Sequence, residues 1–458
     1  MADGVSSVFR RGPGPHPVAV RGEGVWIEDD VGRRYLDAAG GAVAVGVGHG
    51  DAEVVAAITA QAGRLAYVHG TAFTTTAAEA YASALARLLP IEDPRVYPVS
   101  GGSEAMESAL KVARSFHVAR GETDRTVFLA RRRSYHGSTI AALDLSDRPN
   151  LRRPYEPWLG ATERIPAVSE FRCENPDHPS GCAAWHVAAL ERVIDQVGAG
   201  RVAALVAEPI GGAASGAAMP PAGYWDGVAA TCRRHGILLI ADEVMSGFGR
   251  TGRWFACDHF GVRPDVLVAG KGASSGYWPL GLCAVSGAVH DAVAPAGFVH
   301  GFTWSHHPVG AAAGLAVLTA ITERGLVEAA ERQGRVLSAR LGATLAGHPL
   351  VGDIRGIGLL MAIELVADRA TMAPFPHRAG VAAAVTAAAK RLGLLIYPST
   401  GCADGTDGDL VLLGPPLSIS TAEIGILVDR LAAALDEVSS NAALTGRYHD
   451  AQPEKGLR

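Results

Sequence analysis

Gly236-Ile-Leu-Leu-Ile-Ala-Asp-Glu243 and Asp265-Val-Leu-Val-Ala-Gly-Lys-Gly272 are the two stretches that decide the fold. Each is a short apolar run that ends in polar residues, which is the pattern of a strand buried on both faces. Ligands of open parallel sheets bind beyond the carboxyl ends of the strands. We therefore expect Asp242 and Lys271 on the same edge of one sheet, where the glycines beside Lys271 would let a ligand approach closely.

Similar apolar runs recur on both sides of these two stretches and alternate with helical patterns. They cover residues 95–99, 126–130, 202–207 and 282–286. This alternation predicts an α/β fold with a mainly parallel sheet wrapped by helices. A hairpin is predicted over residues 24–37, and a strand-like run over 352–365 with a last helix over 421–438 indicates a separate, smaller domain.

The composition excludes several classes of function. The chain has 458 residues, 48% of them hydrophobic, and a formal net charge of -5. There is no basic field or Lys/Arg block for nucleic acid, no apolar segment after Arg10 and Arg11 that would make a secretory signal, and no stretch long enough to span a bilayer. Gly46-Val-Gly-His-Gly50 lacks the spacing of a dinucleotide-binding turn. We expect a cytoplasmic protein that binds neither nucleic acid nor membrane.

A third polar element follows the strand over 95–99. In Ser100-Gly-Gly-Ser-Glu-Ala105 a helix is predicted to begin near Ser103, directly after a glycine-rich turn. Free amides at such a start can bind a phosphate, although many helices begin this way merely as a cap. Asp242 could likewise cap a helix, and Lys271 could be a solvated loop residue. Together, an amine, a carboxylate and a phosphate cradle are what pyridoxal phosphate requires.

The longer motifs around these residues resemble a known family. Ala241-Asp-Glu-Val-Met-Ser-Gly-Phe-Gly-Arg-Thr-Gly252, then Ala269-Gly-Lys-Gly272, and the turn after Val99 are similar to the signature of the class III aminotransferases, of fold type I. The resemblance runs along nearly the whole chain. It implies a large cofactor-binding domain over 61–324, with a mainly parallel sheet of the seven-stranded type, and a smaller α+β domain built from both chain ends, 1–60 and 325–458.

The resemblance also implies a role for each site residue. Lys271 would hold pyridoxal 5'-phosphate as a Schiff base and act as the catalytic base, and Asp242 would pair with the pyridine nitrogen. Gly102 and Ser103 would contact the phosphate. Tyr135, supported by His136, would stack on the ring, and Val244 would press on the opposite face of the ring. Glu208 would line the cofactor pocket. Thr303 would reach the phosphate of a neighbouring subunit, so a homodimer with shared active sites is expected. The expected reaction moves an amino group from an amine or amino acid to a keto acid or aldehyde.

Departures from the family pattern bear on the substrate. Ala213 stands where some members carry a glutamate, and Leu412 stands where its partner arginine is expected. An insertion over 397–409 occupies the region where amine transaminases can carry a mobile arginine. Arg148, Arg152 and Arg153 are the remaining candidates for a substrate carboxylate, and at least two of them are expected to be ordinary surface charges.

Two other activities stay open from the sequence. Gly272-Ala-Ser-Ser-Gly276 satisfies the pattern of a serine hydrolase, with Ser274 as nucleophile and Asp291 and His300 later in the chain. A racemase or epimerase, or a decarboxylating transaminase, would share the cofactor and the scaffold.

One cysteine and histidine cluster lies apart from these motifs. Cys173, His178, Cys182 and His186 fall within fourteen residues. Such a mixture could ligate zinc, and Cys173 and Cys182 could form a disulfide. The spacing fits no standard zinc finger, and the intervening prolines and glycine are typical of a surface loop. We therefore expect an ordinary loop and no metal.

Overall fold

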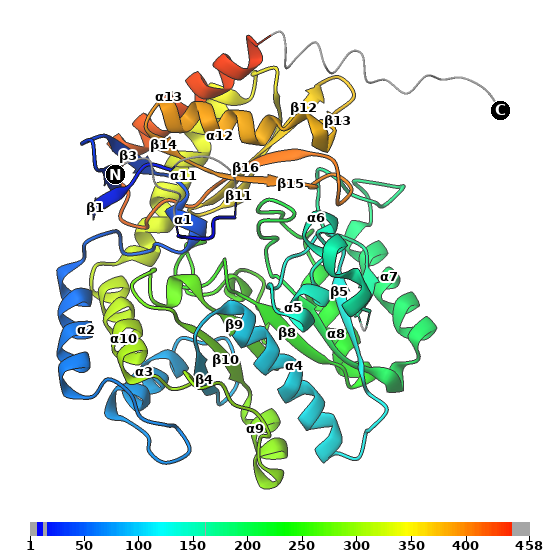
Figure 1. The fold of residues 1–458 in the computed structure, drawn as a ribbon. Helices are drawn as coiled ribbons and strands as arrows, with labels where there is room; N and C mark the ends of the chain where they lie inside the picture. Colours follow the sequence, from blue (N-terminus) through cyan, green and yellow to red (C-terminus); the bar gives the residue numbers. More distant parts are fainter. Residues whose placement is uncertain (1–6, 12–15, 161, 442–458) are drawn as a thin grey trace.

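The computed structural model describes residues 7–11, 16–160 and 162–441, and these fold around three sheets (Figure 1). The largest sheet has seven strands in the order β4-β10-β9-β8-β7-β5-β6. Strand β10 is antiparallel to both neighbours, and β9, β8, β7, β5 and β6 pair in parallel. The strands are β4 (Arg95–Val99), β5 (Val127–Arg131), β6 (Thr162–Ile165), β7 (Val202–Ala207), β8 (Leu238–Asp242), β9 (Val266–Ala269) and β10 (Gly281–Val285). This confirms the predicted α/β fold and its mainly parallel sheet.

Both faces of this sheet are buried, which explains the uninterrupted apolar runs. In β7, Ala204 and Val206 pack in the cluster that contains α4 (Gly102–Ala119). Leu205 and Ala207 point the other way, into the cluster formed with α7 (Cys182–Val197) and α8 (Tyr224–His235). Strand β6 was not predicted from the sequence, because its residues Thr-Glu-Arg-Ile are mostly polar. It lies at the edge of the sheet, where β5 is its one partner strand among the described residues.

Further helices complete the layers around the large sheet. Helix α10 (Pro308–Glu323) packs against α2 (Ala52–Arg64) and α3 (Thr76–Ala86). The core between them includes Leu267, Ala269 and Leu282 from the sheet. The short helices are α1 (Gly40–Val43), α5 (Ile140–Leu145), α6 (Pro149–Arg152), α9 (Gly287–Val293), η1 (Arg153–Trp158), η2 (Ala199–Arg201), η3 (Ala256–His259), η4 (Lys271–Ala273), η5 (Ala294–Ala296) and η6 (His377–Ala379).

Segments from the N-terminal and C-terminal parts of the chain lie together in the upper part of the molecule in Figure 1. Strand β3 from the N-terminal part pairs in parallel with β14, which lies more than 350 residues later in the chain. The sheets there have the orders β1-β2-β3-β14 and β11-β12-β16-β15, with β13 paired to β12, and α11, α12 and α13 pack nearby. The predicted smaller α+β unit from both chain ends is thus confirmed. The elements are β1 (Ala19–Glu23), β2 (Trp26–Asp29), β3 (Arg34–Asp37), β11 (Val351–Ile357), β12 (Leu360–Asp368), β13 (Ala373–Pro374), β14 (Leu394–Leu395), β15 (Tyr397–Thr400), β16 (Asp409–Leu413), α11 (Leu326–Leu345), α12 (Val381–Arg391) and α13 (Thr421–Ser439).

One predicted element of this unit differs from the structure. The run over 352–365 is two strands, β11 and β12, that pair with each other in an antiparallel hairpin. The chain turns at Gly358, whose φ of 58° lies in the left-handed region that glycine adopts without strain. The domain limits at residues 60 and 324 remain predictions, and α2 spans the first of them.

No single helix in the described ranges is long and apolar enough to cross a membrane. Helices α10 and α11 pass that test only as a pair, and they are bent by 63° at the break between them. The polar tail expected from about Ser439 falls mostly in residues 442–458, outside the described residues.

Candidate active site

A cavity of about 170 Å³ opens at the carboxyl ends of β8 and β9, where the sequence predicts the site. Eight of the nine predicted site residues line it: Gly102, Ser103, Tyr135, His136, Glu208, Asp242, Val244 and Lys271. The ninth, Thr303, does not.

Lys271 and Asp242 converge because their strands are parallel neighbours in register. Asp242 is the last residue of β8 and pairs with Val268, three residues before Lys271. Lys271 itself has a φ of 45°, an uncommon value for a residue with a side chain. Its neighbour Gly272 is required by close packing, because a Cβ there would lie 2.9 Å from the Cβ of Phe248. The turn after β9 therefore holds the amine toward the cavity at some cost in backbone strain.

The surroundings of the amine favour its neutral, nucleophilic form. Burial lowers the pKa of Lys271 to about 8, and the carboxylates of Asp242 and Glu208 oppose that shift only in part. Burial also raises the pKa of Glu208, whose Oε1 accepts a hydrogen bond from the Gly212 amide at 3.0 Å. A lysine with a depressed pKa is suited to forming a covalent bond with a carbonyl compound.

Asp242 is held by two hydrogen bonds. Its Oδ2 lies 2.7 Å from Nδ1 of His136, and its Oδ1 accepts from the Val244 amide at 3.0 Å. Both side chains of the Asp242–His136 pair are almost fully buried. Nε2 of His136 is buried and has no hydrogen-bond partner among the described residues. His136 lines the cavity, and its imidazole holds the Asp242 carboxylate in place through Nδ1. Its Nε2 remains available for a further hydrogen bond.

The start of α4, which lies beside the turn that carries Lys271, offers an anion site in the wall of the cavity. Its N-cap residue, Gly101, provides no side-chain cap for the first amides of the helix. Ser103 Oγ accepts from the Ser138 amide at 3.1 Å, and the buried Ser100 Oγ has no partner among the described residues. A Cβ on Gly102 would lie 2.8 Å from Cγ1 of Val244, so the turn packs directly on the cavity wall. Uncapped amides at the positive end of an 18-residue helix fit a phosphate.

Tyr135 and Thr303 differ in their relation to this cavity. Tyr135 lines it, and its hydroxyl lies 2.9 Å from Ser138 Oγ. Thr303 is exposed in a turn outside the cavity, where Tyr67 donates a hydrogen bond to its carbonyl at 2.8 Å. Within this chain, Thr303 has no access to the pocket that the other eight residues share.

The structure adds lining residues that the sequence analysis did not single out. Ile210 and Met245 contribute apolar wall. Met245 directly follows Val244 in the quoted motif, and Ile210 lies two positions after Glu208, so adjacency along the chain was the available signal. Ala213, in the place where some family members carry glutamate, also lines the cavity, whereas Leu412 is fully buried in β16.

Of the three arginines considered for a substrate carboxylate, only Arg148 suits that role. Burial lowers its pKa, and the groups that act on it electrostatically include Tyr397, Tyr135 and Glu208. Its guanidinium donates to Ser399 Oγ at 3.1 Å, and no ion pair with an acidic side chain is found among the described residues. Arg152 instead donates to three main-chain carbonyls, and Arg153 is exposed.

The residues of the hydrolase alternative are scattered. Ser274 Oγ donates to the Trp278 carbonyl at 2.5 Å, His300 pairs with Ser108 at 2.8 Å, and Asp291 pairs with His290. A serine hydrolase needs its nucleophile and histidine within hydrogen-bond reach. The Ser274 pattern is therefore part of the Lys271 turn and not a hydrolase site.

Comparisons with known proteins found a matching family model, related sequences and similar structures. Residues 9–435 match the model of the family Aminotransferase class-III. The chain is 36% identical over 430 residues to the aminotransferase YodT of Bacillus subtilis, covering 93% of this chain and 96% of that protein. It is similar to an (S)-enantioselective omega-transaminase from Thermomicrobium roseum, with a TM-score of 0.87, 37% identity and 93% of each chain covered. An omega transaminase from Pseudomonas jessenii in complex with PMP has a TM-score of 0.88 and 30% identity, over 96% of this chain and 97% of that one.

Proposed function

The chain belongs to the class III aminotransferases, and we propose that it moves an amino group from an amine or amino acid to a keto acid or aldehyde with pyridoxal 5'-phosphate held at Lys271. The observation that carries this proposal is the convergence of three groups on one cavity: the Lys271 amine, the Asp242 carboxylate and the uncapped start of α4. The family depends on pyridoxal phosphate, and the three groups match its aldehyde, ring nitrogen and phosphate in chemical type.

The residues present fit that cofactor. Gly102 and Ser103 would hold the phosphate at the start of α4, Tyr135 would stack on the ring with His136 in support, and Val244 would press on the other face. Glu208 closes the same cavity. When bound, pyridoxal phosphate supplies an electron sink for the carbanion that forms on the substrate.

The chain's own residues supply the proton chemistry. Asp242 would keep a proton on the pyridine nitrogen, because a buried carboxylate favours the cation beside it. His136 orients that carboxylate through the 2.7 Å contact. Lys271 would hold the cofactor and would also serve as the base that takes up and returns the substrate's proton, and a depressed pKa lets one amine do both near neutral pH.

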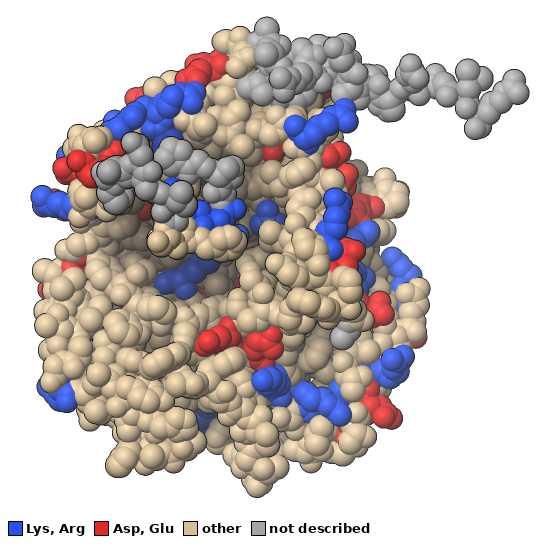
Figure 2. Space-filling model, viewed as in Figure 1, with Lys and Arg blue, Asp and Glu red and all other residues tan. Residues whose placement is uncertain are grey.

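A homodimer would complete the site. Thr303 lies outside the cavity of its own chain, next to Trp304, whose side chain is 54% exposed and packs edge-on against Tyr67. Phe73, between α2 and α3, is 67% exposed. The face over α2, α3 and α10 carries few charged side chains in Figure 2. Exposed aromatic side chains on a face with little charge are typical of subunit interfaces, so we expect Thr303 to reach the partner's phosphate site. A cytoplasmic location remains a prediction from the sequence.

Covalent capture tests the proposal directly. The chain has only four lysines, Lys111, Lys271, Lys390 and Lys455. Borohydride reduction of protein saturated with pyridoxal phosphate should label the peptide that contains Lys271, and Lys271→Ala should lose both the label and transamination. The exposed Lys111→Ala is the matched control and should keep both. Label at another lysine, or turnover by Lys271→Ala, would refute the assignment.

A second experiment separates transamination from racemisation on the same scaffold. Single enantiomers of amino donors are incubated with the enzyme in the absence of any keto acceptor. Transamination then stops when the cofactor has accepted one amino group per site, whereas a racemase converts the substrate pool to a mixture of both enantiomers.

A further inference from the structure

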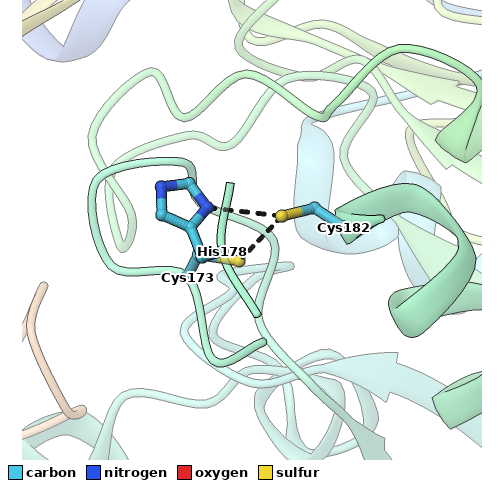
Figure 3. A group of neighbouring side chains, drawn as sticks. All are labelled: Cys173, His178 and Cys182. Carbon is cyan, nitrogen blue, oxygen red and sulfur yellow. Dashed lines mark hydrogen bonds between the residues drawn. The ribbon is translucent and has the colours of Figure 1, made fainter. Parts of the chain in front are cut away.

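Three of the four residues in the cysteine and histidine cluster meet in space, away from the active-site cavity (Figure 3). Cys173 Sγ lies 3.6 Å from Cys182 Sγ, and His178 Nδ1 lies 3.3 Å from the same Cys182 sulfur. All three ligand atoms lie within 4.8 Å of one another. His186 is not in this group; it packs edge-on against Trp185 and Tyr224.

The two distances from the Cys182 sulfur match edges of a tetrahedral metal site. Zinc bonds of about 2.3 Å to sulfur and about 2.0 to 2.1 Å to nitrogen require about 3.8 Å between two sulfurs and about 3.6 Å between sulfur and nitrogen. The observed 3.6 and 3.3 Å lie within a few tenths of an ångström of these edges. Thiolate and imidazole ligands in tetrahedral geometry select zinc over hard cations such as Mg²⁺ and Ca²⁺.

The chain around the cluster holds the ligands in place. Asn175 Nδ2 donates to the Ser180 carbonyl at 2.7 Å and to Cys182 Sγ at 3.4 Å, and its Oδ1 accepts from the Asp177 amide. Cys182 is the first residue of α7, where the helix dipole favours a thiolate. Polar support of this kind behind the ligands is typical of metal sites.

The cluster also anchors a segment that joins the two parts of the molecule. Glu174, next to Cys173, forms ion pairs with Arg132 and Arg133, just before the active-site segment at Tyr135. Arg172, on its other side, donates to the buried Glu364 of β12 at 2.8 Å. An ion bound at Cys173 would therefore fix the segment that braces the large sheet against the C-terminal sheet.

We propose that Cys173, His178 and Cys182 bind one zinc ion, with solvent as the fourth ligand, and that this ion is structural. His178 is exposed, which leaves one side of the cluster open to water. Binding releases the protons of the two thiols, and the resulting thiolates balance the charge of the ion. The metal lies outside the cavity of Lys271 and takes no part in the amino-group transfer. This proposal departs from the sequence-based expectation of an ordinary loop without metal.

Metal content of the intact enzyme tests the proposal. Protein with its affinity tag removed is incubated with zinc, passed through a desalting column and analysed by elemental mass spectrometry. We expect about one zinc ion per chain, and loss of that zinc in Cys173→Ser, His178→Ala and Cys182→Ser. The matched controls are Cys232→Ser, a buried cysteine elsewhere, and His290→Ala, a half-buried histidine elsewhere, and both should retain the metal.

Cobalt provides a readout of the ligands that does not depend on activity. Cobalt replaced into the site should give the intense visible bands of a tetrahedral thiolate complex, and they should be absent from His178→Ala. Because the His178 side chain is exposed, its truncation keeps the fold, which circular dichroism will verify. Chelation should lower the melting temperature of the wild type and leave that of His178→Ala unchanged.

Three results would overturn the proposal. They are a wild-type enzyme that retains no zinc, a His178→Ala or Cys182→Ser variant that retains as much as the wild type, and a disulfide between Cys173 and Cys182 in reduced-buffer protein that binds no metal. Loss of transamination with the zinc content intact would instead count against the proposed function alone.

Discussion

Replacing Gly102 by alanine should weaken cofactor binding through Val244. A Cβ at position 102 would lie 2.8 Å from Cγ1 and 3.0 Å from Cγ2 of Val244, closer than packed carbon atoms come. Val244 is β-branched and has few side-chain rotamers, so it can relieve the clash only by moving into the cavity. Such overpacking costs about 1 to 3 kcal/mol, which is about a fivefold to 150-fold increase in Kd for pyridoxal phosphate.

The protein without cofactor should be affected much less. Alanine is better than glycine inside a helix by about 1 kcal/mol, and Gly102 is the first residue of α4, so part of the strain is offset in folding. The assay is a titration of cofactor-free protein with pyridoxal phosphate, followed by absorbance, beside a thermal melt of the cofactor-free form. Gly101→Ala is the control, because a Cβ there meets no atom within 4 Å.

A double variant decides whether the reasoning is right. Val244→Ala removes both methyl groups, so Gly102→Ala in that background should add no further loss of affinity. If Gly102→Ala weakens binding equally in both backgrounds, the loss comes from the phosphate side of the turn, and the account based on Val244 is refuted.

Three more predictions concern titration and charge. The rate at which cofactor-free enzyme captures pyridoxal phosphate should rise with pH through about 8, because burial lowers the pKa of Lys271 to about 8 and only the neutral amine attacks. A midpoint of this pH dependence near 10.4, the pKa of an unperturbed lysine, would contradict the prediction. Arg148→Gln should raise the KM for a keto-acid acceptor by about tenfold or more, which is the worth of a charged hydrogen bond, and should leave the KM for an aldehyde acceptor unchanged. Arg153→Gln, at an exposed position, is the control. Equal effects on both acceptors would show that Arg148 does not bind the carboxylate. Burial raises the pKa of Asp409 to about 6, so the folded state loses stability as the pH rises from about 4 to 6. The variant Asp409→Asn should therefore have a higher melting temperature at pH 7, because it removes a cost of about 1 to 3 kcal/mol, and should change little at pH 4. A lower melting temperature at pH 7 would show that the charge is compensated.

The large sheet was predictable because its strands are buried on both faces. Such strands are continuous apolar runs, and six of the seven, all except β6, were predicted within one residue of their observed bounds. Strand β6 was not predicted because an edge strand buries less side-chain surface and needs fewer apolar residues. The hairpin at Gly358 was not predicted because the single apolar run over residues 352–365 contains most of two strands, β11 and β12.

The core of the candidate site was predictable for a related reason. Asp242 and Lys271 each follow directly from a strand, so the parallel pairing of β8 and β9 brings them together whatever the loops do. Roles that depend on distant loops could not be read in this way. Nothing in the sequence separates Arg148 from Arg152, and only packing shows that one meets Ser399 and the other its own main chain.

The sequence by itself determined the α/β sheet, the edge on which the chemistry lies and the pair Asp242 and Lys271, since these follow from local patterns and one pairing rule. Tertiary structure alone decided which contacts join segments far apart in the chain. It separated Ser274 from His300, placed Thr303 outside its own cavity, and brought Cys173, His178 and Cys182 together without His186. The physical reason is that a side chain's partners across the fold depend on how whole layers pack, and that packing is a property of the complete chain.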